Sequence, residues 1–309
     1  MAKIPKILLV PLLIFSLILL SLILNNIGRK NQYDVFYSGS KNLFIQSNQN
    51  SVAVENIINS VSQKFPGRYA LYIKDLKTQK TYKLNSEDKF SSASIYKLAV
   101  MYKTFDAIEK NQITDSEILS NNKETLDKKL SDNPKQNQNP EQDQISPELV
   151  SFNIKEALRL MITISDNYSA ILLAEKLGWG EIDDLMKKEG IDNFDLIGSN
   201  SPQITAAAVA KLLERVYANK AVSANASERM KKLLFDQKIN DRIPKYLPAD
   251  IKIGHKTGEL GLIRHDAGII LGRKSHYIFV FLTETPSPDD AAENIAQLSK
   301  KIFDELEKD

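Results

Sequence analysis

Ser94 and Lys97 lie three residues apart, so on a helix their hydroxyl and amine would share one face. Burial can lower the pKa of a lysine toward neutrality, and a neutral amine can accept the proton of a serine. At the start of a helix, the backbone N–H of the serine and the helix dipole can also stabilise an oxyanion. The pair is therefore a candidate nucleophile and base for acyl transfer.

The Ser-x-x-Lys pattern alone is weakly specific, because it occurs four times, starting at Ser38, Ser86, Ser94 and Ser120. Only the copy at Ser94 opens a segment with helical apolar spacing, which predicts a helix from Ala93 to Lys110. The other three fall in polar stretches. Context therefore selects Ser94.

Two further short motifs follow in order, Ser165-Asp166-Asn167 and Lys256-Thr257-Gly258. Ser165 interrupts the helical pattern of residues 153–177, and such a turn can aim its side chains into a cleft. A second Ser-Asp-Asn, residues 131–133, precedes Pro134 in a polar tract where little would hold a catalytic geometry. We therefore expect only the copy at 165–167 to be functional.

With these three motifs in this order, the chain resembles the class A β-lactamases, within the superfamily of serine β-lactamases and penicillin-binding proteins. The resemblance covers about residues 52–307. It includes the hairpin pattern Tyr69–Leu84, the phrase at residues 89–94 and the strand pattern Ile251–Gly258. It implies a serine hydrolase that opens the β-lactam ring through an acyl-enzyme on Ser94.

Carried over by motif, the resemblance makes Ser94 the nucleophile and Lys97 its activating amine. Ser165 would relay a proton to the leaving nitrogen. These three residues are the implied catalytic set.

The implied substrate-binding set comes from the same motifs and the strand that follows. Asn167 would hold the substrate amide, and Lys256 and Thr257 would bind the substrate carboxylate. The backbone N–H of Glu259 would complete the oxyanion hole with that of the nucleophile. Arg264 would add positive charge for the carboxylate, although a solvated strand arginine is an equally good interpretation.

The sequence departs from the family in two places. The family pattern Glu-x-x-Leu-Asn, which positions the deacylating water, is missing from residues 190–202, which contain no glutamate. Glu189 and Asn193 have the family separation, but Glu189 ends a helical pattern, so the match is interpreted as chance. Asp195 receives no role. Glu259 stands where the family usually has a small residue, and its carboxylate would repel an anionic substrate unless it turns away.

The order of the elements predicts an α+β fold, with an antiparallel sheet flanked by helices and an inserted all-α lobe. We expect strands at 69–74, 80–84, 251–257, 264–271 and 276–283, and helices at 52–65, 180–189, 203–218 and 289–307, besides those given above. The domain would span residues 51–309, with 121–147 as a flexible, solvated insertion. His255 and His265 are interpreted as structural.

The N-terminus predicts one transmembrane helix before this domain. The apolar run Ile7 to Leu24 would span about 27 Å as a helix, and no Ala-x-Ala cleavage pattern follows it. We therefore interpret residues 1–30 as a membrane anchor or uncleaved signal and residues 31–50 as a polar tether. The domain would be extracytoplasmic, or secreted if the segment is cleaved.

Composition limits the remaining functions. The formal net charge of +2 argues against nucleic acid as a partner, and the absence of cysteine excludes disulfides and thiolate chemistry. No cofactor, metal or protein partner is indicated. The expected ligand is a small β-lactam or a peptidoglycan stem peptide. Two alternatives stay open, a D-alanyl-D-alanine-type peptidase or esterase, and a membrane-anchored penicillin-binding sensor without turnover.

Overall fold

The computed structural model describes residues 52–60, 65–130, 148–197 and 201–308. The chain divides into two compact units after Ala53, and the fold concerns the second, Val54–Asp309. The predicted membrane segment and tether lie outside the described residues. Within the described residues, no helix has the length and apolar character that crossing a bilayer requires.

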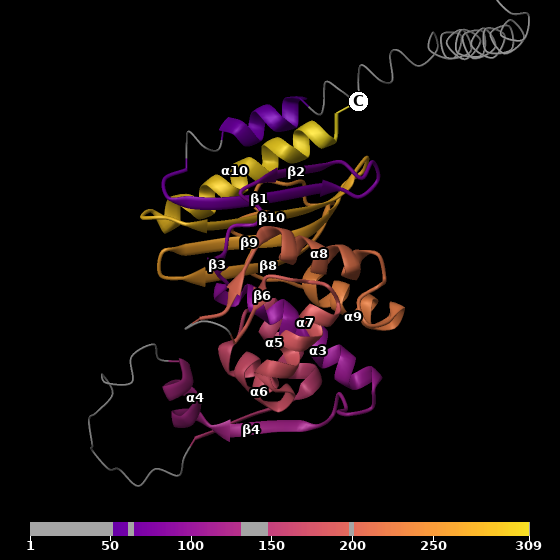
Figure 1. Ribbon diagram of the computed structural model, residues 1–309, viewed down its shortest axis with the longest axis vertical. Helices are drawn as coiled ribbons and strands as arrows, with labels where there is room; N and C mark the ends of the chain where they lie inside the picture. The colour runs from indigo at the N-terminus through magenta and orange to yellow at the C-terminus, as the bar shows by residue number, and fades with distance from the viewer. Residues whose placement is uncertain (1–51, 61–64, 131–147, 198–200, 309) are drawn as a thin grey trace, which may run out of the picture. The chain divides into compact units, whose positions relative to one another are not determined.

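Five strands form one antiparallel sheet in the order β2-β1-β10-β9-β8. Strands from the beginning and the end of the domain therefore pair side by side, as Figure 1 shows. This confirms the prediction of an α+β fold whose sheet is built from distant segments. The strands are β1 (Arg68–Asp75), β2 (Thr81–Leu84), β8 (Lys252–Leu260), β9 (Ile263–Leu271) and β10 (His276–Glu284).

One face of the sheet is covered by the C-terminal helix α10 (Pro288–Leu306) and by the helical residues 52–60 (Figure 1). Apolar side chains from alternate positions of β1 and β10, such as Ile73 and Phe279, pack there against Ile295 and Ile302 of α10. All four are fully buried. Every second side chain of a strand, and one side chain about every 3.6 residues of the helix, point to the same side, so each element contributes one apolar face to this layer.

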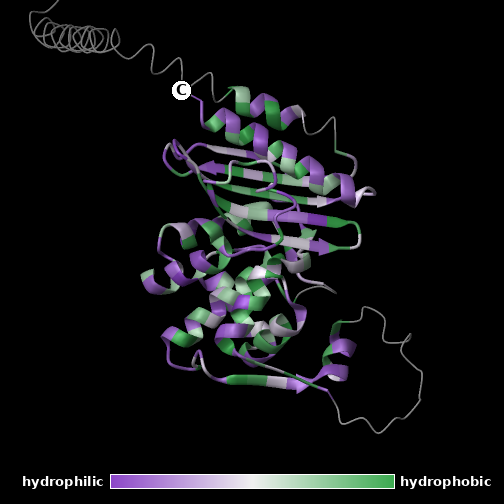
Figure 2. Cartoon of the chain, turned by 180° about the vertical axis from the view of Figure 1, so that it is seen from behind, coloured by the Kyte–Doolittle hydropathy of each residue, from purple (hydrophilic) through white to green (hydrophobic). Residues whose placement is uncertain are grey.

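The other face of the sheet packs against the helical lobe. In Figure 2 hydrophobic and hydrophilic residues alternate along these helices, as expected where one face is buried. The lobe and its connections comprise η2 (Ala93–Tyr96), α3 (Lys97–Glu109), α5 (Ile154–Thr163), α6 (Asn167–Leu177), α7 (Trp179–Lys188), α8 (Ala206–Tyr217) and α9 (Ala224–Phe235). A small sheet of β3 (Phe90–Ser91), β7 (Gln203–Ile204) and β6 (Phe194–Asp195) lies beside them.

The prediction of a solvated loop over 121–147 is wrong for its first part. Residues 123–130 form helix α4 (Lys123–Leu130), which follows β4 (Ile118–Asn122) of a two-stranded sheet with β5 (Leu149–Asn153). Leu126 of α4 is fully buried and anchors the helix to the apolar core of the lobe. A single buried side chain gives no periodic pattern, which is why the sequence did not indicate this helix. Residues 131–147 lie outside the described part of the chain.

Candidate active site

Ser94 lies in the short 3₁₀ turn η2, which continues directly into α3. The residue before it, Ala93, has a positive φ of 43°, a conformation that costs free energy for a residue with a Cβ atom. Ser94 is partly exposed and lines a cavity of about 470 Å³. The candidate nucleophile is therefore held in a tight turn and is accessible to a ligand.

Lys97 is the first residue of α3, and its side chain is fully buried. Its Nζ donates hydrogen bonds to the Ser165 carbonyl at 2.6 Å, to the Ser165 hydroxyl at 3.2 Å and to Asn167 Oδ1 at 2.6 Å. Burial lowers the pKa of Lys97 to about 7, against the opposing effect of the nearby Asp166 carboxylate. Near neutral pH a substantial fraction of this amine is thus free to accept a proton.

Lys256, on β8, approaches the same serine from the sheet. Its Nζ donates to the Ser165 hydroxyl at 2.9 Å and to the Thr257 carbonyl at 2.8 Å. Full burial, and next the positive charge of Lys97, hold the pKa of Lys256 well below its usual range. One hydroxyl therefore lies between two amines and can pass a proton from one side of the site to the other.

The Ser-Asp-Asn motif lies at the break between α5 and α6, as predicted. Ser165 has a φ of 60°, which turns the chain sharply between the two helices. Asp166 caps α6 by accepting a hydrogen bond from the backbone N–H of Ser169 at 2.7 Å. With the helix start fixed in this way, Asn167 points its amide oxygen at Lys97.

The Lys-Thr-Gly motif brings β8 against the turn that holds the nucleophile. A Cβ atom on Gly258 would lie only 3.0 Å from Ile95 Cγ1, so the close approach of β8 to η2 favours glycine there. Thr257 is buried beside it. Ser94 and Glu259, whose backbone N–H groups are the expected oxyanion donors, both line the cavity.

A family model described as the beta-lactamase enzyme family matches residues 53–306, a stretch that runs from β1 through α10 and contains all three motifs. The chain belongs to the beta-lactamase enzyme family. Over 175 residues it is 26% identical to Beta-lactamase BRO-1 of Moraxella catarrhalis. This match covers 49% of this chain and 55% of that protein. The matched segment thus spans little more than half the length of that relative.

Solved structures show the same fold at low identity. The PBP-A L158E mutant, an acyl-enzyme complex with penicillin G, has a TM-score of 0.72 at 21% identity, over 83% of this chain and 97% of that one. A representative of class A β-lactamase from Bacteroides cellulosilyticus DSM 14838 has a TM-score of 0.70 at 21% identity, over 84% of this chain and 99% of that one.

The described residues between α7 and α8 place no carboxylate in the lining of the cavity. Glu189 accepts hydrogen bonds from the Tyr102 hydroxyl at 3.1 Å and from Arg215. Neither Glu189 nor Asp195 belongs to the cavity lining, to which this loop contributes Ser201 and Pro202. Among the described residues, the lining carboxylates are Glu175 and Glu259.

Helix α4 forms one wall of this cavity, a role that the sequence did not indicate. Lys129 and Leu130 line it, and Lys129 forms an ion pair with the lining residue Glu175. The Tyr168 hydroxyl donates to Asp127 Oδ1 at 2.6 Å, which ties α4 to α6 next to Asn167. The residues before the 131–147 tract therefore contribute to the site.

The Glu259 carboxylate lies between two arginines. Arg264, on the neighbouring strand β9, is 3.1 Å from it, and Arg242 is 2.7 Å from it. The sequence leaves two interpretations of Arg264, a partner of the substrate carboxylate or a solvated strand arginine; the structure pairs its guanidinium with Glu259. Arg242 was not singled out from the sequence, because nothing in its local pattern marks it as a partner of β8.

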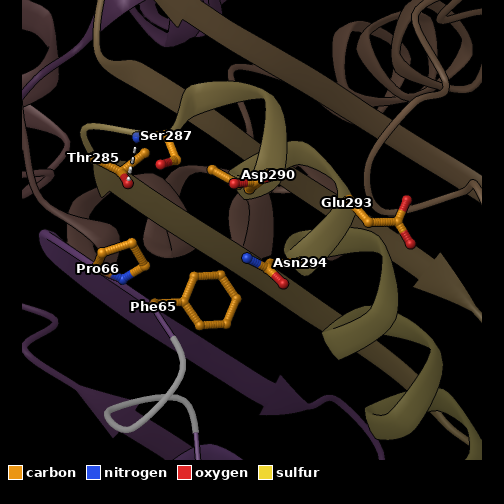
Figure 3. A pocket seen from close by; sticks show the side chains of 8 residues that line it. Phe65, Pro66, Thr285, Ser287, Asp290, Glu293 and Asn294 are labelled. Atoms are coloured by element: carbon orange, nitrogen blue, oxygen red, sulfur yellow. Dashed lines mark hydrogen bonds between the residues drawn. The ribbon is translucent and has the colours of Figure 1, made fainter.

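A second cavity, of about 210 Å³, lies at the opposite face of the sheet between Phe65, Pro66 and the beginning of α10. Figure 3 shows Asp290, Glu293 and Asn294 beside it. None of the three motifs contributes to its lining. The reactive groups of the three motifs therefore lie elsewhere, around the cavity at Ser94.

Asp166→Asn should move the pH dependence of acylation to lower pH. The Asp166 carboxylate favours the protonated form of Lys97, so its removal lowers a pKa that is about 7 in the wild type. Asparagine caps helices as well as aspartate does, so α6 should persist. The measurement is the second-order rate of Ser94 acylation by a chromogenic cephalosporin between about pH 5 and 9. If the basic shift appears instead, so that the rate rises at higher pH than in the wild type, or if the rate does not depend on pH, Lys97 is not the titrating base.

Asn167→Ala should slow acylation on the order of 10²-fold, because it removes both the substrate amide contact and a hydrogen bond to Lys97. Asn133→Ala is the matched control from the second Ser-Asp-Asn copy and should leave the rate unchanged. Rapid-mixing acylation kinetics on the two variants make the comparison. A loss at position 133 with none at 167 would show that the wrong copy was chosen.

Proposed function

We propose that this protein is an active-site-serine hydrolase of the class A type, which opens the β-lactam ring through a Ser94 acyl-enzyme. The observation that carries the proposal is the buried Lys97 amine, one helical turn from Ser94, with a pKa of about 7. Perturbed amines of this kind cluster at catalytic sites. The acyl-enzyme of penicillin G on the structurally similar PBP-A variant supports the same chemistry here.

In the proposed reaction, Ser94 Oγ forms a bond to the lactam carbonyl carbon, and its proton passes to the Lys97 amine. The carbonyl oxygen becomes an oxyanion, which the backbone N–H groups of Ser94 and Glu259 stabilise. Collapse of this intermediate breaks the carbon–nitrogen bond. The leaving nitrogen takes its proton from the Ser165 hydroxyl, which in turn recovers a proton from the Lys97 ammonium. Lys256 also donates a hydrogen bond to this hydroxyl.

Wild-type protein incubated with penicillin G should gain the mass of one penicillin, attached at Ser94. Ser94→Ala should gain none, because the loss of a nucleophile removes the covalent path. Ser91→Ala is the matched control, since Ser91 lines the same cavity and should keep the adduct. Intact-protein mass spectrometry measures the added mass, and peptide mass spectrometry locates the modified residue. An adduct on Ser94→Ala, or none on the wild type with both penicillin G and its methyl ester, would overturn the proposal.

Hydrolysis of the acyl-enzyme should be much slower than its formation. A deacylating water needs a general base within hydrogen-bond reach, and the two lining carboxylates are already engaged, Glu175 by Lys129 and Glu259 by two arginines. A base misplaced by about 1 Å can cost 10²-fold in rate.

We therefore expect a stoichiometric burst with a chromogenic cephalosporin, followed by turnover at least about 10²-fold slower than acylation. Rapid-quench kinetics with adduct quantification measure both phases. If steady turnover reaches hundreds per second without accumulated adduct, a general base that we have not assigned must act. Glu175→Gln and Asp195→Asn would be the first variants to locate it.

The engagement of both lining carboxylates also favours a second candidate. A site that acylates but deacylates slowly suits a D-alanyl-D-alanine-type peptidase or a penicillin-binding sensor, whose natural partner would be a peptidoglycan stem peptide. A D-Ala-D-Ala peptide that is turned over faster than a penam would favour the peptidase. Rapid release of D-alanine is the readout.

We further propose that the domain is attached to a membrane through residues 7–24 and lies outside the cytoplasm. The support is the apolar run and the missing cleavage pattern of the sequence. Full-length protein should stay in the membrane fraction after an alkaline carbonate wash. A soluble mature protein that begins near residues 25–30 would show a cleaved signal instead.

A further inference from the structure

The residue directly after the Lys-Thr-Gly motif places a carboxylate in the wall of the cavity. Glu259 lies near the end of β8, and 55% of its side chain is exposed. Its Oε2 is 2.7 Å from Arg242 Nη2, and its Oε1 is 3.1 Å from Arg264 Nη2. Each oxygen of one carboxylate is therefore bound by a different guanidinium.

The two guanidinium groups are built into the fold. The Arg242 side chain is 1% exposed, and its Nη1 donates to the His265 carbonyl at 3.4 Å. The Arg264 side chain is 13% exposed, and its Nη1 donates to the carbonyls of Gly261 and Ile263. Both groups are held in place by backbone contacts and direct their Nη2 atoms at the same point. This geometry is that of a carboxylate-binding site.

The charge that faces the cavity is nevertheless negative. Asp241 lies 3.6 Å from Arg242 and Asp289 lies 3.8 Å from Arg264, so three carboxylates surround the two guanidiniums. Of these three, Glu259 is the one that lines the cavity. Lys256, the other cation at this end, is fully buried and already donates to Ser165 and Thr257.

We infer that Glu259 is a specificity-determining residue: its carboxylate occupies the place where the two guanidiniums would hold a carboxylate of the ligand. The site therefore favours acyl donors that carry no negative charge beside the scissile bond, such as an ester or amide in place of the free acid. This inference rests on the proposed function and narrows its substrate class. Removal of Glu259 should free both arginines for an anionic ligand.

The test compares penicillin G with its methyl ester, which differs only in the carboxylate. Binding is measured by calorimetry on the non-acylating Ser94→Ala background, with and without Glu259→Ala or Glu259→Gln. The affinity ratio of acid to ester should rise about tenfold in Glu259→Ala. Glu259→Gln, which keeps an acceptor oxygen but no charge, should give a smaller rise.

Asp289→Asn is the matched control, because it removes the same charge beside Arg264 from a fully exposed position. It should change the ratio less than about twofold. Because Glu259 is half-exposed, the variants should fold, which thermal unfolding verifies. An unchanged ratio in folded Glu259→Ala would overturn the inference. A failure of the proposed function would appear separately, as the absence of any adduct on wild-type protein with either ligand.

Discussion

Two buried lysines that share one serine hydroxyl are the constraint on which the site depends. Lys97 and Lys256 are both fully buried, and burial of an ammonium costs on the order of several kcal/mol after relaxation. The fold offsets this cost with hydrogen bonds that the two amines donate to Ser165, Asn167 and the Thr257 carbonyl, and with pKa values below the usual lysine range. To place these partners, α5 must break at Ser165, and β8 must pack closely on η2. The same burial lowers the pKa of Lys97 to about 7, as the proposed role of general base requires.

Much of this site could be predicted from the sequence, because the apolar spacing around each motif indicates the element that holds it. The helix start at Ser94, the interrupted helix at Ser165 and the strand before Gly258 each have a periodic pattern around the motif. The pattern separates them from the copies at Ser38, Ser86 and Ser120 and at 131–133. The strands of the sheet were predicted within a few residues, because each buries apolar side chains with a regular period.

The parts that the sequence did not reveal depend on partners distant in the chain. Arg242 forms its ion pair with Glu259 only in the folded chain, and no local sequence pattern predicts such a pair. Helix α4 has one buried apolar residue, Leu126, so its contribution to the cavity wall through Lys129 and Leu130 had no periodic signal. Both features determine the charge and the walls around the reactive groups of the three motifs.

Burial should leave the Lys97 amine partly neutral at physiological pH. Its ionisation can be followed directly by NMR of the side-chain Cε and Nζ nuclei in isotope-labelled protein, with Lys97→Arg to assign the signal. The account predicts a titration midpoint near 7. A Lys97 amine that titrates at the ordinary lysine value of about 10.5 would contradict it.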